Sequence, residues 1–214
     1  MTSSTRAARG GGRANGSADE QGSTAQRERR RRILDATLAL ASKGGFEAVQ
    51  MRAVAERADV ALGTLYRYFP SKIHLLVSAL AREFERTQDR IDRAILRGDT
   101  PYDRLMLMLG GITKAMQRDP QLTEAMTRAF MFADASAAAE VDAVGRLMDS
   151  MFARAMNNGE PTEEQLAIAR VISDVWLSNL VAWVTRRASA TDVANRLELT
   201  IGLLLGRRQA ADAF

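Results

Sequence analysis

Apolar residues recur every three or four positions along most of the chain after residue 26, which is the period of helices that bury one face. Ile33, Leu34, Leu38 and Ala41, for example, fall on one side of such a helix. The strict alternation of apolar and polar residues that marks a half-buried strand is missing from the sequence. The spacing therefore predicts an all-α fold, with helices over residues 27–42, 51–57, 62–69, 71–96, 102–117, 121–132, 137–157, 162–187 and 190–205.

Two of the predicted helices are short and follow each other closely, at residues 51–57 and 62–69. Small residues in this region allow the two helices to cross at a short distance, and a long helix follows Pro70. This is the layout of a helix-turn-helix, which places its second helix in the major groove of DNA. We therefore expect double-stranded DNA as a partner.

Candidate DNA contacts lie at the helix starts and on the outward face of the second short helix. Gly63 and Thr64 are near the start of that helix, where base edges come closest, and Tyr66 faces outward beside them. The other candidates are placed to contact phosphate. The complete set of predicted DNA contacts is Gln50, Arg52, Gly63, Thr64, Tyr66, Tyr68 and Lys72.

A phosphate contact is expected for Lys72 because this residue lies in the first turn of the long helix. Ser71 is a suitable N-cap for this helix, and a cation directly after the cap opposes the helix dipole. The placement is favourable when an anion such as a DNA phosphate docks at the helix N-terminus. The alternative is a solvated lysine that is slightly unfavourable for the helix.

The segments 52–58 (RAVAERA) and 64–72 (TLYRYFPSK) resemble the signature of TetR-family transcriptional regulators. The resemblance implies a homodimer that binds palindromic operator DNA, with an N-terminal helix-turn-helix head and a helical ligand-binding body in each subunit. It also implies repression that a small molecule relieves. The chain departs from the family pattern at Ala61, at Leu62 and in the turn, where Asp59 replaces glycine but tolerates the left-handed conformation better than most residues.

The distribution of charge agrees with a DNA-binding N-terminal part. Residues 1–72 hold 13 Lys and Arg against 7 Asp and Glu, whereas residues 73–214 hold 17 against 19. A basic surface is the footprint of a module that binds phosphate. The first residues hold no large apolar side chain, which is typical of disorder. We expect a disordered tail over 1–25, a DNA-binding domain over 26–72, and a ligand-binding and dimerisation domain over 73–214.

Composition narrows the chemistry of the chain. It has no cysteine and one histidine, His74, which excludes disulfides and metal sites built from cysteine or clustered histidine. No nucleophile motif accompanies His74, which we interpret as structural, so we expect neither an enzyme nor a cofactor. The sequence shows no uninterrupted run of about 18 apolar residues and no signal peptide, which predicts a cytoplasmic protein without a membrane span.

Methionine is concentrated in the second half of the chain, where eight of the ten fall within residues 106–156. Methionine is flexible and polarizable, and it is common at adaptable apolar binding surfaces. A cavity lined this way would suit a large, rigid, apolar ligand, but an ordinary bundle core uses the same residues at the same spacing. The candidate ligand contacts are Phe84, Leu105, Met108, Leu109, Ile112, Met116, Met126, Phe130, Met148, Met151, Phe152 and Trp176.

Segments of the body, at 122–130, 132–137 and 172–192, resemble TetR-type repressors of bacterial sterol catabolism. The resemblance implies that the effector is a sterol-derived acyl-CoA thioester. The CoA head would need cations at a cavity mouth, and Arg118 and Arg128 are candidates.

The last two predicted helices carry apolar residues on more than one face. One face can pack on the body, and the surplus favours pairing with the same helices of a second subunit. The two heads of this homodimer would lie about 34–36 Å apart, as successive major grooves do.

The function favoured by these features is a repressor of lipid and cholesterol catabolism genes that its ligand releases from DNA. Three alternatives stay open: a TetR-type repressor that responds to fatty acyl-CoA or other hydrophobic molecules, an enzyme acting on lipids, and a nonspecific DNA-binding protein of the nucleoid type.

Overall fold

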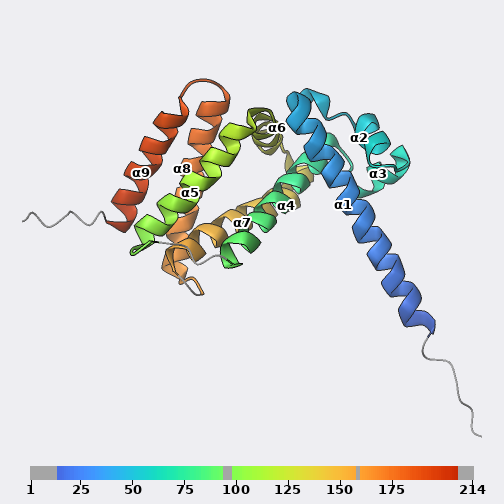
Figure 1. Cartoon of the computed structure of the whole chain (residues 1–214), viewed down its shortest axis with the longest axis horizontal. Coiled ribbons are helices and arrows are strands. Elements are labelled where there is room, and N and C mark those ends of the chain that lie inside the picture. The colour runs from blue at the N-terminus through green and yellow to red at the C-terminus, as the bar shows by residue number, and fades with distance from the viewer. Residues whose placement is uncertain (1–13, 94–97, 158–159, 207–214) are drawn as a thin grey trace, which may run out of the picture.

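A computed structural model describes residues 14–93, 98–157 and 160–206, and within these ranges every regular element is helical (Figure 1). The predicted all-α fold is confirmed. The helices are α1 (Ala14–Ala48), α2 (Met51–Arg57), α3 (Leu62–Tyr68), α4 (Lys72–Arg93), α5 (Pro101–Arg118), α6 (Pro120–Met131), α7 (Ala138–Met156), α8 (Glu163–Val184) and α9 (Ala190–Leu205), with a short 3₁₀ helix η1 (Ala135–Ala137) before α7.

The first three helices pack together as a head at one end of the molecule (Figure 1). Ile33 of α1, Val54 of α2 and Leu65 of α3 meet in a core from which water is excluded, and Phe69 closes it after α3. This packing turns one side of α3 inward and leaves the other side to solvent.

Local signals set many of the helix ends. Both α2 and α9 begin and end at the predicted residues, and α8 begins after Thr162, the first residue of the predicted range, with a capping box. There, Thr162 Oγ1 accepts a hydrogen bond from the Gln165 N–H at 3.2 Å, and Gln165 Oε1 accepts one from the Thr162 N–H at 2.9 Å. Because each side chain satisfies the other residue's unpaired N–H, the start of α8 is well defined.

Helix α1 differs from the prediction at its N-terminal end. It begins at Ala14 instead of near Arg27, so residues 14–25, which were expected in a disordered tail, are helical. Alanine, glutamate and glutamine in this segment favour the helix, and each residue added to an existing helix is easier to order than a new turn. The segment projects away from the rest of the molecule (Figure 1). Residues 1–13 lie outside the described residues.

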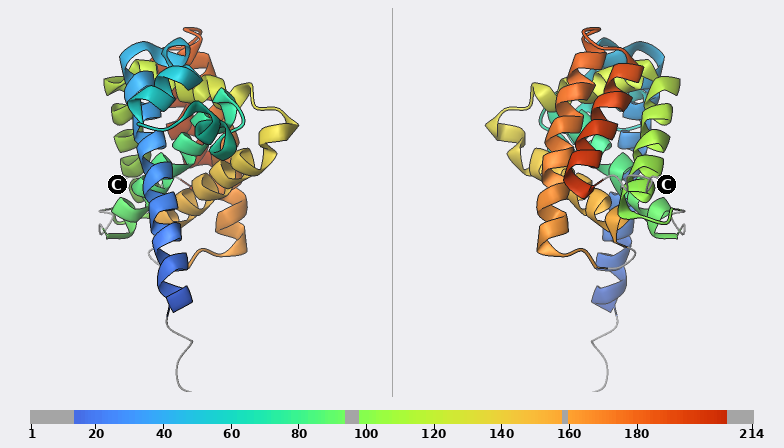
Figure 2. Two further views of the ribbon diagram at one scale, coloured as in Figure 1. Left: turned by 90° about the vertical axis from the view of Figure 1, so that its right-hand side faces the viewer. Right: turned by 90° about the vertical axis from the view of Figure 1, so that its left-hand side faces the viewer.

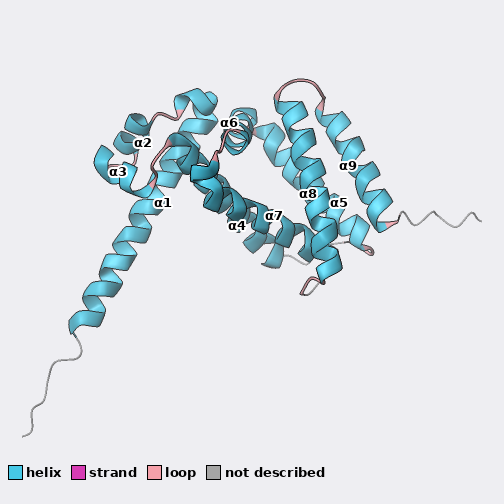
Figure 3. Cartoon of the chain, turned by 180° about the vertical axis from the view of Figure 1, so that it is seen from behind, coloured by secondary structure: helices cyan, strands magenta, loops and turns pink. Residues whose placement is uncertain are grey.

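Helix α4 links the head to the body, where it packs against α6 and α7 (Figure 3). Helix α7 also packs on α5 and α8. Trp176 lies at the centre of the body, with its ring edge-on to Phe84 at 6.2 Å and to Phe152 at 6.1 Å. Helices α8 and α9 pack side by side on the face of the body that is turned away from the head (Figure 2).

Helix α8 is by length and composition apolar enough to cross a membrane, with a mean hydropathy of 1.3. In this fold its inner face places Ile172, Trp176 and Leu180 against α6, α7 and α9. Only 39% of the apolar window is buried, so α8 also presents apolar surface to the outside, as it does at Val171.

Arg104 of α5 is buried and closes the C-terminal end of α7. Its guanidinium donates to the carbonyl oxygens of Ala155 at 3.0 Å and Met156 at 2.7 Å, and to that of Gly98 at 3.2 Å. The last carbonyls of a helix have no partner within the helix and carry partial negative charge. Arg104 therefore joins α5 to the C-terminal end of α7.

The Arg104→Met variant should lower the free energy of unfolding by about 2–3 kcal/mol, because the buried carbonyls lose charged hydrogen-bond donors while the apolar stem is kept. Urea unfolding followed by circular dichroism measures this. Arg146→Met, at an exposed position of α7, is the control and should change the value by less than about 0.5 kcal/mol. Equal stability of the two variants would contradict the structural role of Arg104.

Candidate functional site

The outer face of α3 carries three of the residues predicted to contact DNA. Gly63 is exposed and the next residue, Thr64, is half-buried. Tyr66 is 46% exposed although it is a large aromatic residue. Gln50 and Arg52 are exposed at the start of α2. The packing of the head thus brings these predicted contacts onto α2 and α3.

The turn between α2 and α3 depends on Asp59, whose φ of 52° lies in the left-handed region. Aspartate adopts this conformation more easily than most residues, as the sequence predicted. The side chain of Asp59 is fully exposed and lies 3.7 Å from a guanidinium nitrogen of Arg32. The turn therefore keeps its geometry without glycine.

A second group of polar residues surrounds Tyr68 at the C-terminal end of α3. Gln26 and Arg29 of α1, together with Arg67 of α3, line a hollow beside the half-buried Tyr68. Arg29 and Arg67 were not among the predicted contacts. Their signal in the sequence is weak, because one arginine inside a run and another on a short helix look like ordinary solvated residues.

Lys72 lies at the junction of head and body. Its Nζ is 3.8 Å from the centre of the Phe46 ring, and burial lowers its pKa, with Glu47 raising it and Arg128 lowering it. In this structure the ammonium group rests on Phe46, so the phosphate contact proposed for Lys72 stays a prediction.

Five residues form what we call the junction cluster: Phe46, Glu47, Lys72, Glu124 and Arg128. The Arg128 guanidinium lies over the Phe46 ring, 4.4 Å from its centre, and pairs with Glu47 at 3.0 Å. Glu124 accepts a hydrogen bond from the backbone N–H of Phe46 at 3.2 Å. Phe46 follows the break in α1, whereas Glu124 and Arg128 belong to α6. The junction cluster therefore attaches α6 directly to the head.

The break in α1 shapes this contact. Gly45 has a φ of 65°, and a Cβ added there would lie 3.2 Å from the Glu124 carboxylate. Glycine thus satisfies both the left-handed backbone and the close approach of α6.

Two further contacts hold α4, one to η1 and one to α1. His74 is buried, with Nδ1 2.9 Å from Ser71 Oγ and Nε2 2.9 Å from the Ser136 carbonyl oxygen. Closer to the body, Asp35 of α1 pairs with Arg82 of α4 at 2.8 Å. His74 has the structural place that the sequence predicted, tying α4 to η1.

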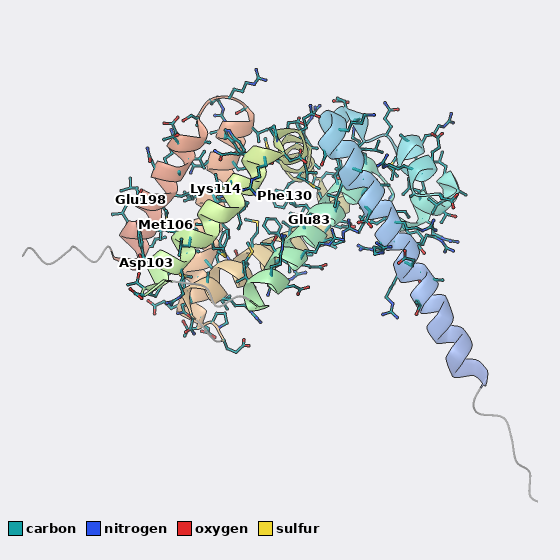
Figure 4. All side chains as sticks on the ribbon, viewed as in Figure 1. Glu83, Asp103, Met106, Lys114, Phe130 and Glu198 are labelled. Atoms are coloured by element: carbon teal, nitrogen blue, oxygen red, sulfur yellow. The ribbon has the colours of Figure 1, made fainter. Side chains whose placement is uncertain are left out.

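The body contains an apolar cavity of about 500 Å³ lined by α4, α5, α6, α7 and α8. Trp176 and Phe84 form part of its inner wall, and methionines from α5, α6 and α7 line it further. Figure 4 shows Glu83 of α4 and Phe130 of α6 on the side of the body nearer the head, with α5 and its Lys114 on the other side. The residues alone left open whether the body is solid, and the structure shows a cavity.

Eight of the twelve candidate ligand contacts line this cavity: Phe84, Met108, Ile112, Met116, Met126, Phe130, Met148 and Trp176. The other four, Leu105, Leu109, Met151 and Phe152, are buried in the surrounding core. Small and polar lining residues, such as Gly111, Thr123 and Thr127, were not predicted, because the apolar period of a helix gives no signal for them.

Polar groups lie on the α4 side of the cavity. Arg90 donates to Thr87 Oγ1 at 3.2 Å and to the Arg86 carbonyl oxygen at 3.1 Å. Among the side chains that the structure describes, Arg90 is the single cation lining the cavity. Arg118 and Arg128, suggested for a CoA head, are not in the lining, and Arg128 is engaged in the junction cluster.

Two family models match this chain. The N-terminal model, "Bacterial regulatory proteins, tetR family", matches residues 33–79, and the "Tetracyclin repressor-like, C-terminal domain" model matches residues 98–204. The first match falls on the head and the start of α4, and the second falls on the helices α5 to α9 of the body.

Known proteins agree with these matches. The HTH-type transcriptional repressor KstR of Mycolicibacterium smegmatis is 75% identical over 193 residues, which cover 90% of this chain and 95% of that protein. The crystal structure of a TetR transcriptional regulator from Rhodococcus sp. RHA1 is similar with a TM-score of 0.76 and 32% identity, over 85% of this chain and 97% of that one.

A second similar structure is FadR of Thermus thermophilus, a TetR-family repressor in complex with lauroyl-CoA. Its TM-score is 0.65 at 22% identity, over 86% of this chain and 98% of that one, which shows a shared fold. Taken with the helix-turn-helix head and the separate helical body, the similarity to KstR and both family models shows that this chain belongs to the TetR family of bacterial transcriptional regulators.

Proposed function

We propose that this protein is a dimeric transcriptional repressor of sterol-catabolic genes, released from its operator by a sterol-derived acyl-CoA thioester. The observation that carries the proposal is the apolar cavity behind the head, in a body that is similar to KstR throughout. Because the similarity covers the cavity-forming helices as well as the head, it supports a shared class of ligand and not only DNA binding.

The cavity has the properties that a large apolar ligand needs. Its volume of about 500 Å³ is within the usual range for ligand sites, and its wall combines aromatic rings with adaptable methionines. Arg90 at the polar side is placed to attract the anionic part of a CoA thioester, which would extend out of the cavity. A fatty acyl-CoA is the second candidate, favoured by the lauroyl-CoA complex of the similarly folded FadR.

Dimerisation has a suitable surface on α8 and α9. Val171 of α8 and Leu199, Leu203 and Leu204 of α9 are exposed apolar residues. Pairing of these helices with their copies would bury them in a four-helix interface and fix the spacing of the two heads.

Helix α6 supplies a route from ligand to DNA. One side of α6 lines the cavity with Met126 and Phe130, and another side holds Phe46 of the head through Glu124 and Arg128. A ligand that favours a different position of α6 therefore favours a different position of the head. The operator fits only one spacing of two heads, so this shift releases the DNA.

The CoA thioester of a cholestenoic acid should weaken operator binding by the wild-type protein at least about tenfold, within the usual range of coupling between two sites. Fluorescence anisotropy with labelled operator measures the effect at fixed salt. Stearoyl-CoA is the comparison and should act more weakly. Unchanged operator affinity at saturating sterol thioester would refute the proposed effector, and a stronger effect of stearoyl-CoA would favour the fatty acyl alternative.

Replacing Thr64 or Tyr66 by alanine should weaken operator binding by about 1–3 kcal/mol each, because contacts to base edges are lost. The change on random DNA should be smaller, so the ratio of specific to nonspecific affinity falls. The exposed Arg146→Ala on α7 serves as control. If both head variants bind the operator like the control, α3 is not the reading helix.

The Arg128→Met variant should bind operator and thioester nearly as the wild type does, but release should fall about fivefold because the junction cluster is weakened. Operator affinity is measured with and without thioester, and thioester affinity is measured separately by calorimetry. Full release by Arg128→Met would show that α6 does not act through this cluster.

A further inference from the structure

The exposed part of the cavity lining lies entirely on α4 and α5. Arg90 of α4 and Leu107, Gly111 and Ala115 of α5 are exposed, whereas the other described lining residues are buried or half-buried. Both helices pack on α6 and α7, which form the floor between them. The cavity therefore opens between α4 and α5.

The α5 rim of this opening has its smallest residues, Gly111 and Ala115, on one side of Leu107. Leu107, Gly111 and Ala115 are spaced by four residues, so they form one row along the helix. Gly111, in the middle of the row, leaves bare backbone at the rim. The α4 rim on the opposite side carries Thr87 and Arg90. The opening is therefore polar on the α4 side and apolar on the α5 side.

Gly111 is not required by the packing of the protein itself. A Cβ added at Gly111 would meet no atom within 4 Å, and the same is true of its neighbour Gly110. Both lie inside a helix, where glycine is unfavourable compared with alanine or leucine. Gly111 lines the cavity and Gly110 does not. The space beside Gly111 is thus cavity space that a side chain would take.

We infer that Gly111 sets the width of the cavity mouth, and that the fused rings of a sterol ligand lie against the bare backbone of α5 at this position. This inference rests on the proposed function for the class of ligand. The methionines deeper in the cavity can change rotamer to fit a ligand, but the backbone of α5 cannot retreat as easily. A rigid ring system needs a fixed width there, whereas a straight acyl chain can bend around an obstacle.

The test compares Gly111→Leu with Gly110→Leu, which adds the same side chain one residue away and outside the cavity. Circular dichroism, gel filtration and operator affinity should be those of the wild type for both variants, because a Cβ at either position has no protein atom within 4 Å. Calorimetry then gives the affinities for the cholestenoic acid CoA thioester and for stearoyl-CoA.

Gly111→Leu should bind the sterol thioester at least about tenfold more weakly than the wild type, and stearoyl-CoA less than about threefold more weakly, as expected for overpacking against a rigid ligand. Gly110→Leu should stay within about twofold of the wild type for both. If leucine at position 111 disturbs assembly, Gly111→Ala adds a single methyl group and should still lower the affinity for the sterol thioester more than Gly110→Ala does.

If both leucine variants bind the sterol thioester as tightly as the wild type does, the inference is overturned and the proposed function stays intact. An equal loss in both would also overturn it, because bending of α5 at the glycine pair would then be the cause. If the wild type binds only stearoyl-CoA, the sterol assignment fails, and the inference fails with it because it requires a rigid ring system at Gly111. A wild type that binds neither thioester would overturn both proposals.

Discussion

The contact between α6 and Phe46 is the interaction on which the arrangement of this molecule depends. The Phe46 ring contacts two cations, Lys72 of α4 and Arg128 of α6, and the backbone N–H of Phe46 donates to Glu124. Two carboxylates balance the two cations, so the cluster is held by charge and by the ring together. Helix α6 also lines the cavity, so one helix contacts both the cavity and the head.

Short-range signals made much of the fold predictable. The apolar period predicted every helix from α2 to α9, and in the structure capping boxes define the starts of α5, α8 and α9. The N-terminal extension of α1 was missed because the sequence of residues 14–25 contains no large apolar residue and so shows no apolar period. A helix that projects away from the core depends on local propensity alone.

The cavity could not be predicted from the spacing of apolar residues. A methionine that lines a cavity and one that fills a core have the same spacing, so Met148 and Met151 looked alike, yet only Met148 borders the cavity. Lys72 was expected to face DNA, and in the structure it contacts Phe46 of α1, a tertiary contact for which the sequence pattern gives no signal. Gly111 gave no signal, because glycine breaks the apolar pattern that identifies a lining helix.

The central claim, that filling the cavity moves the heads through α6, is tested most directly by the distance between the two heads. The chain has no cysteine, so a single spin label at Glu56→Cys on α2 reports this distance within the dimer by pulsed electron resonance. Saturating sterol thioester should shift the main distance, and Arg128→Met should reduce the shift. An unchanged distance in a wild-type dimer with the thioester bound would contradict the account.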